Sequence, residues 1–168
     1  RRGVGLGGGG CGVGAGWGKG VLGAGSSGGM RKAMAMAVGG EGAKVVICGR
    51  KLETLSEVVK EAPGSIFALA CHVGRADDLQ KLVASTTEQF GRIDVLVNNA
   101  ATNIAQVPVL TATDQQFEKM VDVNLRSAFR LIQAVAPGMC ERGSGSIINI
   151  ASIAGLKPPF EGMLFSIT

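Results

Sequence analysis

One segment of the chain has residue types that suit the binding of a phosphate group. Residues 25–29 read Gly-Ser-Ser-Gly-Gly and lie between a short apolar run and an expected helix. Glycines let backbone N–H groups approach an anion at the positive end of a helix, so Gly25, Ser27 and Gly29 are candidate pyrophosphate contacts. A flexible turn without a ligand has the same composition in a chain this rich in glycine. The segment alone leaves both interpretations open.

Three further polar residues occupy positions where they could take part in chemistry. Asn98 directly follows the apolar run 93–97, Asn124 lies on the apolar stripe of an expected helix, and Ser152 follows the run 147–150. Each also has a purely structural interpretation: a strand-end turn for Asn98, a hydrogen-bonded core amide for Asn124 and a turn cap for Ser152. His72, the only histidine, is expected at the surface or at the rim of a cofactor site rather than as a base.

Strand and helix patterns alternate along the part of the chain that carries these residues. The run 93–97 is apolar on both faces, as a central parallel strand requires. The residues 113–116 (Thr-Asp-Gln-Gln) have the form of a capping box that opens a helix, whose expected apolar stripe is Phe117, Met120, Val121 and Asn124. The alternation predicts an α/β fold of the Rossmann type, a doubly wound and mostly parallel sheet that is incomplete at its C-terminal side. Strands are expected at 21–22, 44–48, 66–71, 93–97 and 146–150, and helices at 30–38, 52–62, 77–90 and from 114 onward.

The first residues differ in composition from the rest. Residues 1–16 contain only Arg, Gly, Val, Leu, Cys and Ala, and fifteen of the 27 glycines fall within residues 1–29. Such a segment cannot offset the entropy of ordering its backbone. We expect residues 1–16 to form a disordered Gly-rich tail and residues 17–168 to form one partial dinucleotide-binding domain.

Overall composition excludes several classes of protein. With 46% apolar and 18% charged residues among 168, the chain is expected to be globular and cytoplasmic, without a membrane span or a signal peptide. The net charge of +4 is modest and its basic residues are scattered, so nucleic acid is not an expected partner. The four cysteines lie far apart and form no C-x-x-C pair, so neither a disulfide framework nor a metal site is expected.

Several ordered motifs resemble those of the short-chain dehydrogenase/reductase family. The run 98–101 (Asn-Asn-Ala-Ala) resembles its Asn-Asn-Ala-Gly signature, 123–125 (Val-Asn-Leu) its helix asparagine, and 148–152 (Ile-Asn-Ile-Ala-Ser) the strand that leads to its catalytic serine. The match runs from about Lys19 to Thr168. It implies an NAD(P)-dependent oxidoreductase acting on a small carbonyl or alcohol substrate, and a homo-oligomer if the chain were complete.

The resemblance also implies catalytic roles. In the family a tyrosine exchanges a proton with the substrate, a lysine four residues later lowers the pKa of that tyrosine, the serine orients the substrate oxygen, and the helix asparagine holds a water. Ser152 and Asn124 are then catalytic positions, and Phe165 occupies the tyrosine position. The chain ends at Thr168, one residue before the expected lysine. Because phenylalanine has no proton to exchange, we expect no dehydrogenase activity from this chain as written.

Cofactor contacts follow partly from the resemblance. It places Gly25 and Gly29 on family glycines, Arg31 where a third, small residue is usual, and His72 where an acid near the adenine is usual; Asn98 and Ala100 would also contact the cofactor. The segment 48–51 (Cys-Gly-Arg-Lys) has no carboxylate to bind the ribose 2′-hydroxyl of NAD, and Arg50 favours a 2′-phosphate. NADP is therefore expected in preference to NAD, unless Arg50 only solvates the start of a helix.

Two other functions compete with this interpretation. The chain could be a non-catalytic remnant that at most binds a dinucleotide or pairs with an intact homologue, and Phe165 favours this. A methyltransferase shares a Gly-rich first turn but would carry an acid at the end of the second strand, which is absent here. Two features predict weak folding: Gly20 and Gly23 within the first strand, and the apolar run 147–150 at an exposed sheet edge. We expect poor solubility in isolation.

Overall fold

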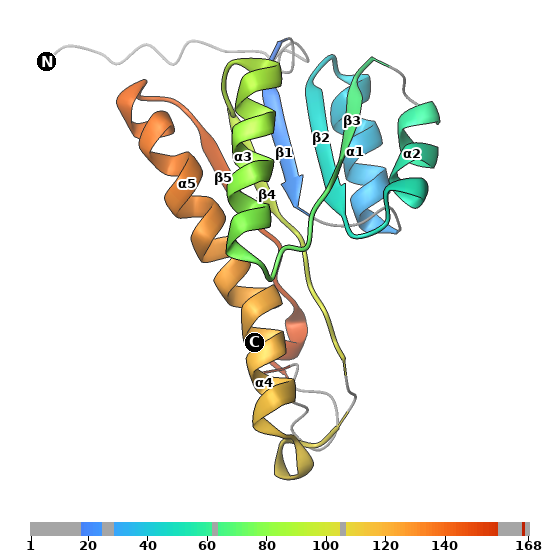
Figure 1. Ribbon diagram of the computed structural model, residues 1–168, viewed down its shortest axis with the longest axis vertical. Helices are drawn as coiled ribbons and strands as arrows, with labels where there is room; N and C mark the ends of the chain where they lie inside the picture. Colours follow the sequence, from blue (N-terminus) through green and yellow to red (C-terminus); the bar gives the residue numbers. More distant parts are fainter. Residues whose placement is uncertain (1–17, 25–28, 62–63, 105–106, 158–165, 167–168) are drawn as a thin grey trace, which may run out of the picture.

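A five-stranded parallel sheet with the strand order β3-β2-β1-β4-β5 forms the centre of the protein (Figure 1). The computed structural model describes residues 18–24, 29–61, 64–104, 107–157 and 166. The order reverses between β1 and β4, so the α/β doubly wound fold predicted from the sequence is confirmed. The strands are β1 (Gly20–Ala24), β2 (Lys44–Gly49), β3 (Ile66–Ala70), β4 (Val95–Asn98) and β5 (Ser146–Asn149).

Helices cover both faces of the sheet. One buried cluster joins α1 and α2 to one face through Ala35, Leu55 and Val58, and a second joins α3 and α5 to the other face through side chains such as Leu82 and Leu131. A π-helical turn, η2, connects α4 to α5, and α4 extends beyond the carboxyl edge of the sheet (Figure 1). The helices are α1 (Met30–Gly40), α2 (Leu52–Glu61), α3 (Ala76–Phe90), α4 (Asp114–Val121), η2 (Asp122–Arg126) and α5 (Ser127–Glu141), with short 3-10 turns η1 (Val109–Thr111) and η3 (Ile153–Gly155).

The first strand, β1, is longer than the predicted pair Val21-Leu22. Gly20 is expected from the sequence to weaken this strand, but the structure has no room for a side chain at that position. A Cβ atom on Gly20 would lie 2.4 Å from the carbonyl oxygen of Arg92. The N–H of Gly20 donates to Oδ2 of Asp94 at 2.9 Å, and the N–H of Asp94 donates to the carbonyl oxygen of Gly20 at 2.8 Å. Glycine is therefore required here, because a side chain would displace the loop that leads into β4.

The helix predicted from residue 114 has the expected start but an interrupted course. The hydroxyl of Thr113 accepts from the N–H of Gln116, and the Gln116 side chain accepts from the N–H of Thr113, so the predicted capping box is confirmed. The predicted apolar stripe is only partly buried: Met120 is fully buried, whereas Phe117 is 38% exposed. The π turn changes the helical phase after Val121, so a constant period of 3.6 residues does not describe the whole helix.

The sheet ends at β5, as the sequence indicated. Ile148 and Ile150 are 43% and 38% exposed, and within the described part of the chain no further strand pairs with β5. This apolar edge is the feature on which the prediction of poor solubility rests. The predicted tail 1–16 lies outside the described residues, as do Gly25, Ser27 and Phe165. Among the residues that are described, no helix is long and apolar enough to span a membrane.

Candidate active site

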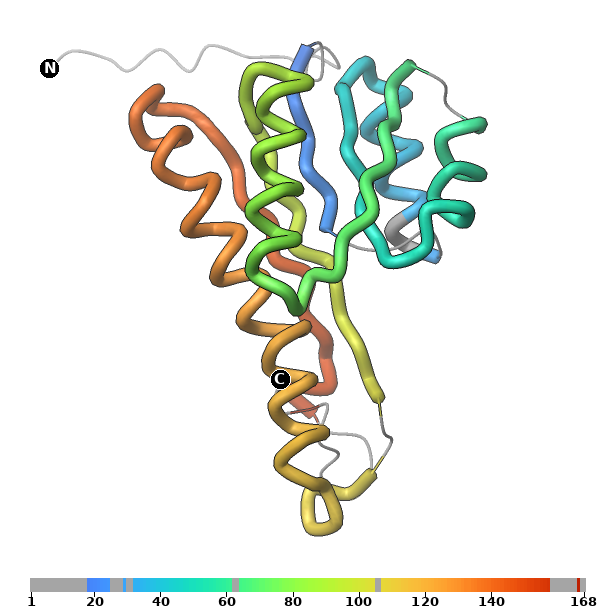
Figure 2. Tube along the Cα trace, viewed as in Figure 1, coloured from blue at the N-terminus to red at the C-terminus, as the bar shows by residue number. Residues whose placement is uncertain are grey.

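A cleft of about 440 Å³ opens at the carboxyl edge of the sheet, where the ends of β2 and β3 face the segment after β4. In the Cα trace, the segments that follow β4 and β5 both leave the sheet on the side of α4 (Figure 2). Ligands of doubly wound folds bind at this edge, next to the point where the strand order reverses. The cleft is lined by Cys48, Gly49, Arg50, Cys71, His72, Val73, residues 100–104, Lys119 and Val123.

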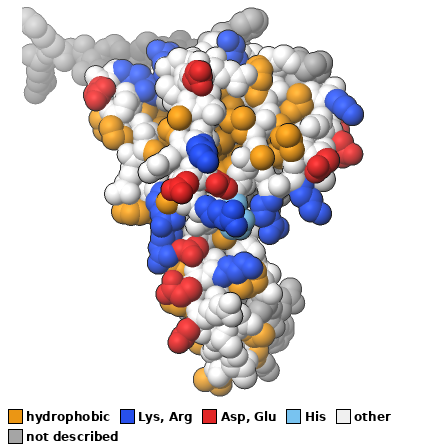
Figure 3. Space-filling model, viewed as in Figure 1, with side chains coloured by type: hydrophobic (Ala, Val, Ile, Leu, Met, Phe, Trp, Pro, Cys, Tyr) orange, Lys and Arg blue, Asp and Glu red, His pale blue; other side chains and the backbone are white. Residues whose placement is uncertain are grey.

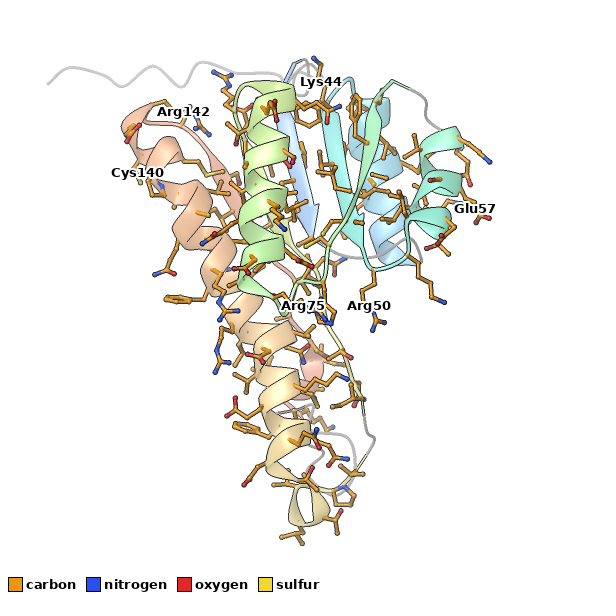
Figure 4. The ribbon with its side chains drawn as sticks, in the orientation of Figure 1. Lys44, Arg50, Glu57, Arg75, Cys140 and Arg142 are labelled. Carbon is orange, nitrogen blue, oxygen red and sulfur yellow. The ribbon has the colours of Figure 1, made fainter. Side chains whose placement is uncertain are left out.

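The charges of the cleft are of one sign. Arg50 and Lys119 line it, and among the described residues that line it none carries a carboxylate. Lysine and arginine side chains gather with the histidine where the sheet meets the α4 projection (Figure 3). Figure 4 shows the side chains of Arg50 and Arg75 at the same end of the sheet. An electropositive cleft without a carboxylate favours an anionic ligand.

The N-terminus of α1 offers backbone donors near this edge. Gly29 precedes the helix with a φ of 61°, and no side chain caps the first turn. A Cβ on Gly29 would meet no atom within 4 Å. The first N–H groups of an α-helix have no partner within the helix, and its dipole favours an anion. Gly29 therefore lies directly before the free backbone donors at the start of α1.

His72 lies in the cleft wall with a defined hydrogen-bonding arrangement. The ring Nδ1 of His72 accepts from the backbone N–H of Gly74 at 3.2 Å. The backbone N–H of His72 donates to Oδ2 of Asp78 at 2.9 Å. The side chain of His72 is half-buried and lines the cleft.

Asn98 joins β4 to β5 at the end of both strands. Its Nδ2 donates to Oδ1 of Asn149 at 2.8 Å, and the N–H of Ile150 donates to the carbonyl oxygen of Asn98 at 2.9 Å. Its side-chain Oδ1 is buried and has no hydrogen-bond partner among the described residues. Asn98 borders a second cavity of about 50 Å³, which Ala100 and Asn124 also line. That volume can hold a water molecule, and a polar lining is what a bound water requires.

Asn124 lies in the π turn and holds the segment that follows β4. Its Oδ1 accepts from the N–H of Thr102 at 2.8 Å, and its Nδ2 donates to the carbonyl oxygen of Thr102 at 3.1 Å. Single π turns inside α-helices occur often at functional sites, because the extra residue redirects side chains. Both polar atoms of the Asn124 amide are therefore hydrogen-bonded, as the interpretation of a core amide expects. The amide also borders the small cavity.

Ser152 is exposed at the start of η3, beyond the end of β5. Its Oγ accepts from the N–H of Ala154 at 3.2 Å, which is the cap interaction that the structural interpretation predicted. The hydroxyl hydrogen can still be donated to a ligand oxygen. Ser152 lies two residues after Ile150, which is bonded to the end of β4, so serine and asparagines share one end of the sheet.

The structure adds residues that sequence reasoning missed. Lys119 reaches the cleft from α4, Asn149 is the side-chain partner of Asn98, and Cys48 and Cys71 form part of the cleft wall. The only available signal was that both cysteines stand at the ends of expected strands. Within the described part of the chain no group of three or more His, Cys, Asp or Glu side chains could hold a metal ion.

The strand order, with a cleft at the carboxyl edge and an uncapped N-terminus of α1, places the chain in the Rossmann fold class. The family model for short chain dehydrogenases matches residues 19–167, and the chain belongs to this family. The resemblance found in the motifs is confirmed. Its members are oxidoreductases, and NAD(P) dependence is general to the family.

Individual relatives support the assignment. Dehydrogenase/reductase SDR family member 4 of Oryctolagus cuniculus is 37% identical over 141 residues, which are 82% of this chain and 54% of the relative. Tropinone reductase-like 3 of Erythroxylum coca is 32% identical over 146 residues, 85% of this chain and 56% of the relative. A metagenomic short-chain oxidoreductase solved in complex with NADP superposes with a TM-score of 0.84 at 32% identity, over 90% of this chain and 70% of that one. The chain spans about half the length of the curated relatives it matches.

Proposed function

We propose that this chain carries the cofactor half of an NADP-dependent oxidoreductase that acts on a small carbonyl or alcohol substrate. The observation that carries the proposal is the cleft at the carboxyl edge, with Arg50 in its wall and no carboxylate among the lining residues that the structure describes. A carboxylate at the end of β2 would favour NAD through the ribose 2′-hydroxyl, whereas a guanidinium favours a 2′-phosphate. NADP in a related structure supports the same choice.

The residues present fit such a dinucleotide. The N-terminus of α1 after Gly29, with Gly25 and Ser27 of the preceding turn, would hold the pyrophosphate. Arg50 would contact the 2′-phosphate, and His72 would border the adenine from the other side of the cleft. Asn98 and Ala100 would flank the cofactor where β4 ends. Gly29, Arg50, His72 and Ala100 all lie at one end of the sheet, as a single extended ligand requires.

Bound NADP supplies hydride transfer to or from the substrate carbon. The Ser152 hydroxyl would then donate to the substrate oxygen and orient it. Asn124 would hold the segment after β4 through Thr102 and keep a water in the adjoining cavity. Phe165 stands where the family uses its tyrosine, and a phenyl ring cannot exchange a proton. We therefore expect binding of the cofactor without turnover by this chain.

Binding measured by isothermal titration calorimetry tests the proposal. The chain is titrated with NADP and with NAD, and so are Arg50→Ala and the control Lys51→Ala, because Lys51 is also exposed but does not line the cleft. Losing a charge-assisted hydrogen bond costs about 1.5–3 kcal/mol, so we expect Arg50→Ala to weaken NADP binding about 10- to 100-fold and to leave NAD unchanged. Equal losses for both dinucleotides, or a larger loss for Lys51→Ala, would refute the assignment of Arg50.

A second candidate, a non-catalytic dinucleotide-binding protein, is favoured by Phe165 alone. Both candidates expect this chain to bind the dinucleotide without turnover, so they differ in whether Ser152 belongs to a substrate site. A small ketone is titrated by calorimetry into the NADP-saturated chain and into NADP-saturated Ser152→Ala. Ketone binding that Ser152→Ala weakens would support the cofactor half of an oxidoreductase, and no ketone binding would support the non-catalytic candidate. Oxidation of NADPH in the presence of a small ketone, followed at its nicotinamide absorbance, would contradict the expectation for Phe165.

A further inference from the structure

Two cysteines from neighbouring strands stand together in the wall of the nucleotide cleft, and the proposed function uses neither. Cys48 is the fifth residue of β2, and Cys71 directly follows β3. The N–H of Cys71 donates to the carbonyl oxygen of Gly49 at 2.9 Å, which holds the two strand ends together. Both side chains belong to the same buried cluster on one face of the sheet, with Cys48 0% and Cys71 4% exposed. Both also line the cleft, so a reagent reaches them from the cleft when its wall opens locally.

The two thiol groups interact directly. The side-chain hydrogen bond between Cys71 and Cys48, together with burial, raises the pKa of the Cys71 thiol well above its ordinary value. Cys71 therefore carries its proton at neutral pH and is a poor nucleophile toward reagents that attack a single thiolate. A reagent that bridges both sulfurs is less affected by this limit. Once one sulfur holds the reagent atom, the second sulfur attacks that same atom within the molecule, at a high effective concentration.

We propose that Cys48 and Cys71 form a dithiol site that binds trivalent arsenicals and similar ligands that bridge two sulfur atoms, and that such a ligand blocks the adenosine half of the cleft. For an arsonous acid the reaction is R–As(OH)₂ + 2 Cys–SH → R–As(S–Cys)₂ + 2 H₂O. Two As–O bonds break, two As–S bonds form, and each thiol proton leaves with a hydroxyl as water. Arsenic stays trivalent, so no oxidant or reductant takes part.

The strand register favours a bridging atom over a disulfide. Cys48 is paired with Leu69, so Cys71 lies two residues further along the neighbouring strand. At about 3.3 Å per residue and about 4.8 Å between strands, the two Cα atoms are about 8 Å apart. A disulfide requires a separation below about 7 Å. An arsenic atom inserted between the sulfurs lengthens the link and removes this restriction.

The test uses phenylarsine oxide on the whole chain, followed by intact-mass spectrometry. We expect one phenylarsenic group per chain, reversed by a dithiol but not by a monothiol. Cys48→Ala and Cys71→Ala should each abolish it. Cys140→Ser is the matched control and should leave it unchanged, because Cys140 is exposed on α5 and remote from the cleft. Proteolysis of the unaltered adduct should release one species that joins peptides containing Cys48 and Cys71, a result that does not depend on the folding of a variant.

Absence of the adduct, or an adduct on Cys140 or Cys11, would overturn the dithiol site. Blocking of the cleft rests on the proposed function and has its own readout. At tenfold above its dissociation constant, NADP should slow formation of the adduct about tenfold. If the bridged peptides form, and NADP binds without slowing formation of the adduct, the dithiol site stands and its overlap with the cofactor site is refuted. If NADP does not bind at all, the proposed function fails while the bridged peptides still support the dithiol site.

Discussion

Replacing Asn124 by alanine tests how the π turn organises the site. The Asn124 amide makes two hydrogen bonds with the backbone of Thr102, at 2.8 and 3.1 Å. Alanine removes both and leaves the N–H and the carbonyl group of Thr102 in a half-buried position without these partners. Because Thr102 belongs to the segment that lines the cleft, we expect this segment to open more often while the sheet stays intact.

The size of the expected loss of protection follows from the two hydrogen bonds that Asn124→Ala removes. At a net contribution of about 1 kcal/mol each, the free energy of opening this segment falls by about 2 kcal/mol, which corresponds to about a thirtyfold loss of protection from exchange. Hydrogen–deuterium exchange with mass spectrometry resolves this, since local opening appears in one peptide and global unfolding in all of them. The expected change is confined to peptides that cover residues 99–104.

Leu125→Ala provides the control for this experiment. Leu125 lies in the same π turn, and its side chain is 49% exposed, so its removal should leave exchange near residue 102 unchanged. A loss of protection below about threefold in Asn124→Ala, or an equal loss in Leu125→Ala, would refute the assigned role of the amide. A loss spread evenly over β1, β2 and β4 would show a contribution to global stability instead.

Three further predictions concern stability, solubility and reactivity. Gly20→Ala should lower Tm by about 5 °C or more, because its Cβ would lie 2.4 Å from a backbone oxygen. The control Gly40→Ala, whose Cβ would meet no atom within 4 Å, should be neutral or stabilising by up to about 1 kcal/mol. Equal Tm values for the two variants would contradict the close packing at Gly20. Ile148→Lys should reduce aggregation measured by light scattering without lowering Tm, because Ile148 is 43% exposed on the edge strand. Unchanged scattering would show that the exposed edge of β5 does not cause the aggregation. Alkylation of Cys71 by iodoacetamide, mapped by peptide mass spectrometry, should stay slow as pH rises through 9.0, because the raised pKa of Cys71 keeps the thiol protonated. A steep rise in the alkylation rate near pH 9.0 would refute a raised pKa.

The sequence was sufficient for the fold class and for most of the elements. Alternating strand and helix patterns predicted five strands within a few residues of β1 to β5, and the capping box at Thr113 located the start of α4. These signals are local: periodicity, capping and glycine-rich turns act within one segment. The family motifs likewise identified the chain as a short-chain dehydrogenase, which the match over residues 19–167 confirms.

The sequence was misleading where two distant segments meet. Gly20 was interpreted as a weakness of the first strand, yet the backbone at Arg92, 72 positions later, leaves no room for a side chain. The stripe that was extended from Phe117 to Asn124 assumed a regular helix, and the π turn breaks that regularity. Neither effect has a local signature, because each depends on which atoms from elsewhere in the chain occupy the neighbouring space.

The class of fold, the family and the residue types available for chemistry could all be predicted from local patterns and motifs. Which of these residues lie together depends on the folded chain: Asn98 lies with Asn149, Asn124 with Thr102, and Cys48 with Cys71 in one wall of the cleft. The physical reason is the parallel sheet. It brings to one edge the carboxyl ends of strands whose paired residues are 21 positions apart for β2 and β3 and 51 positions apart for β4 and β5. That proximity is set by register and packing rather than by any local pattern.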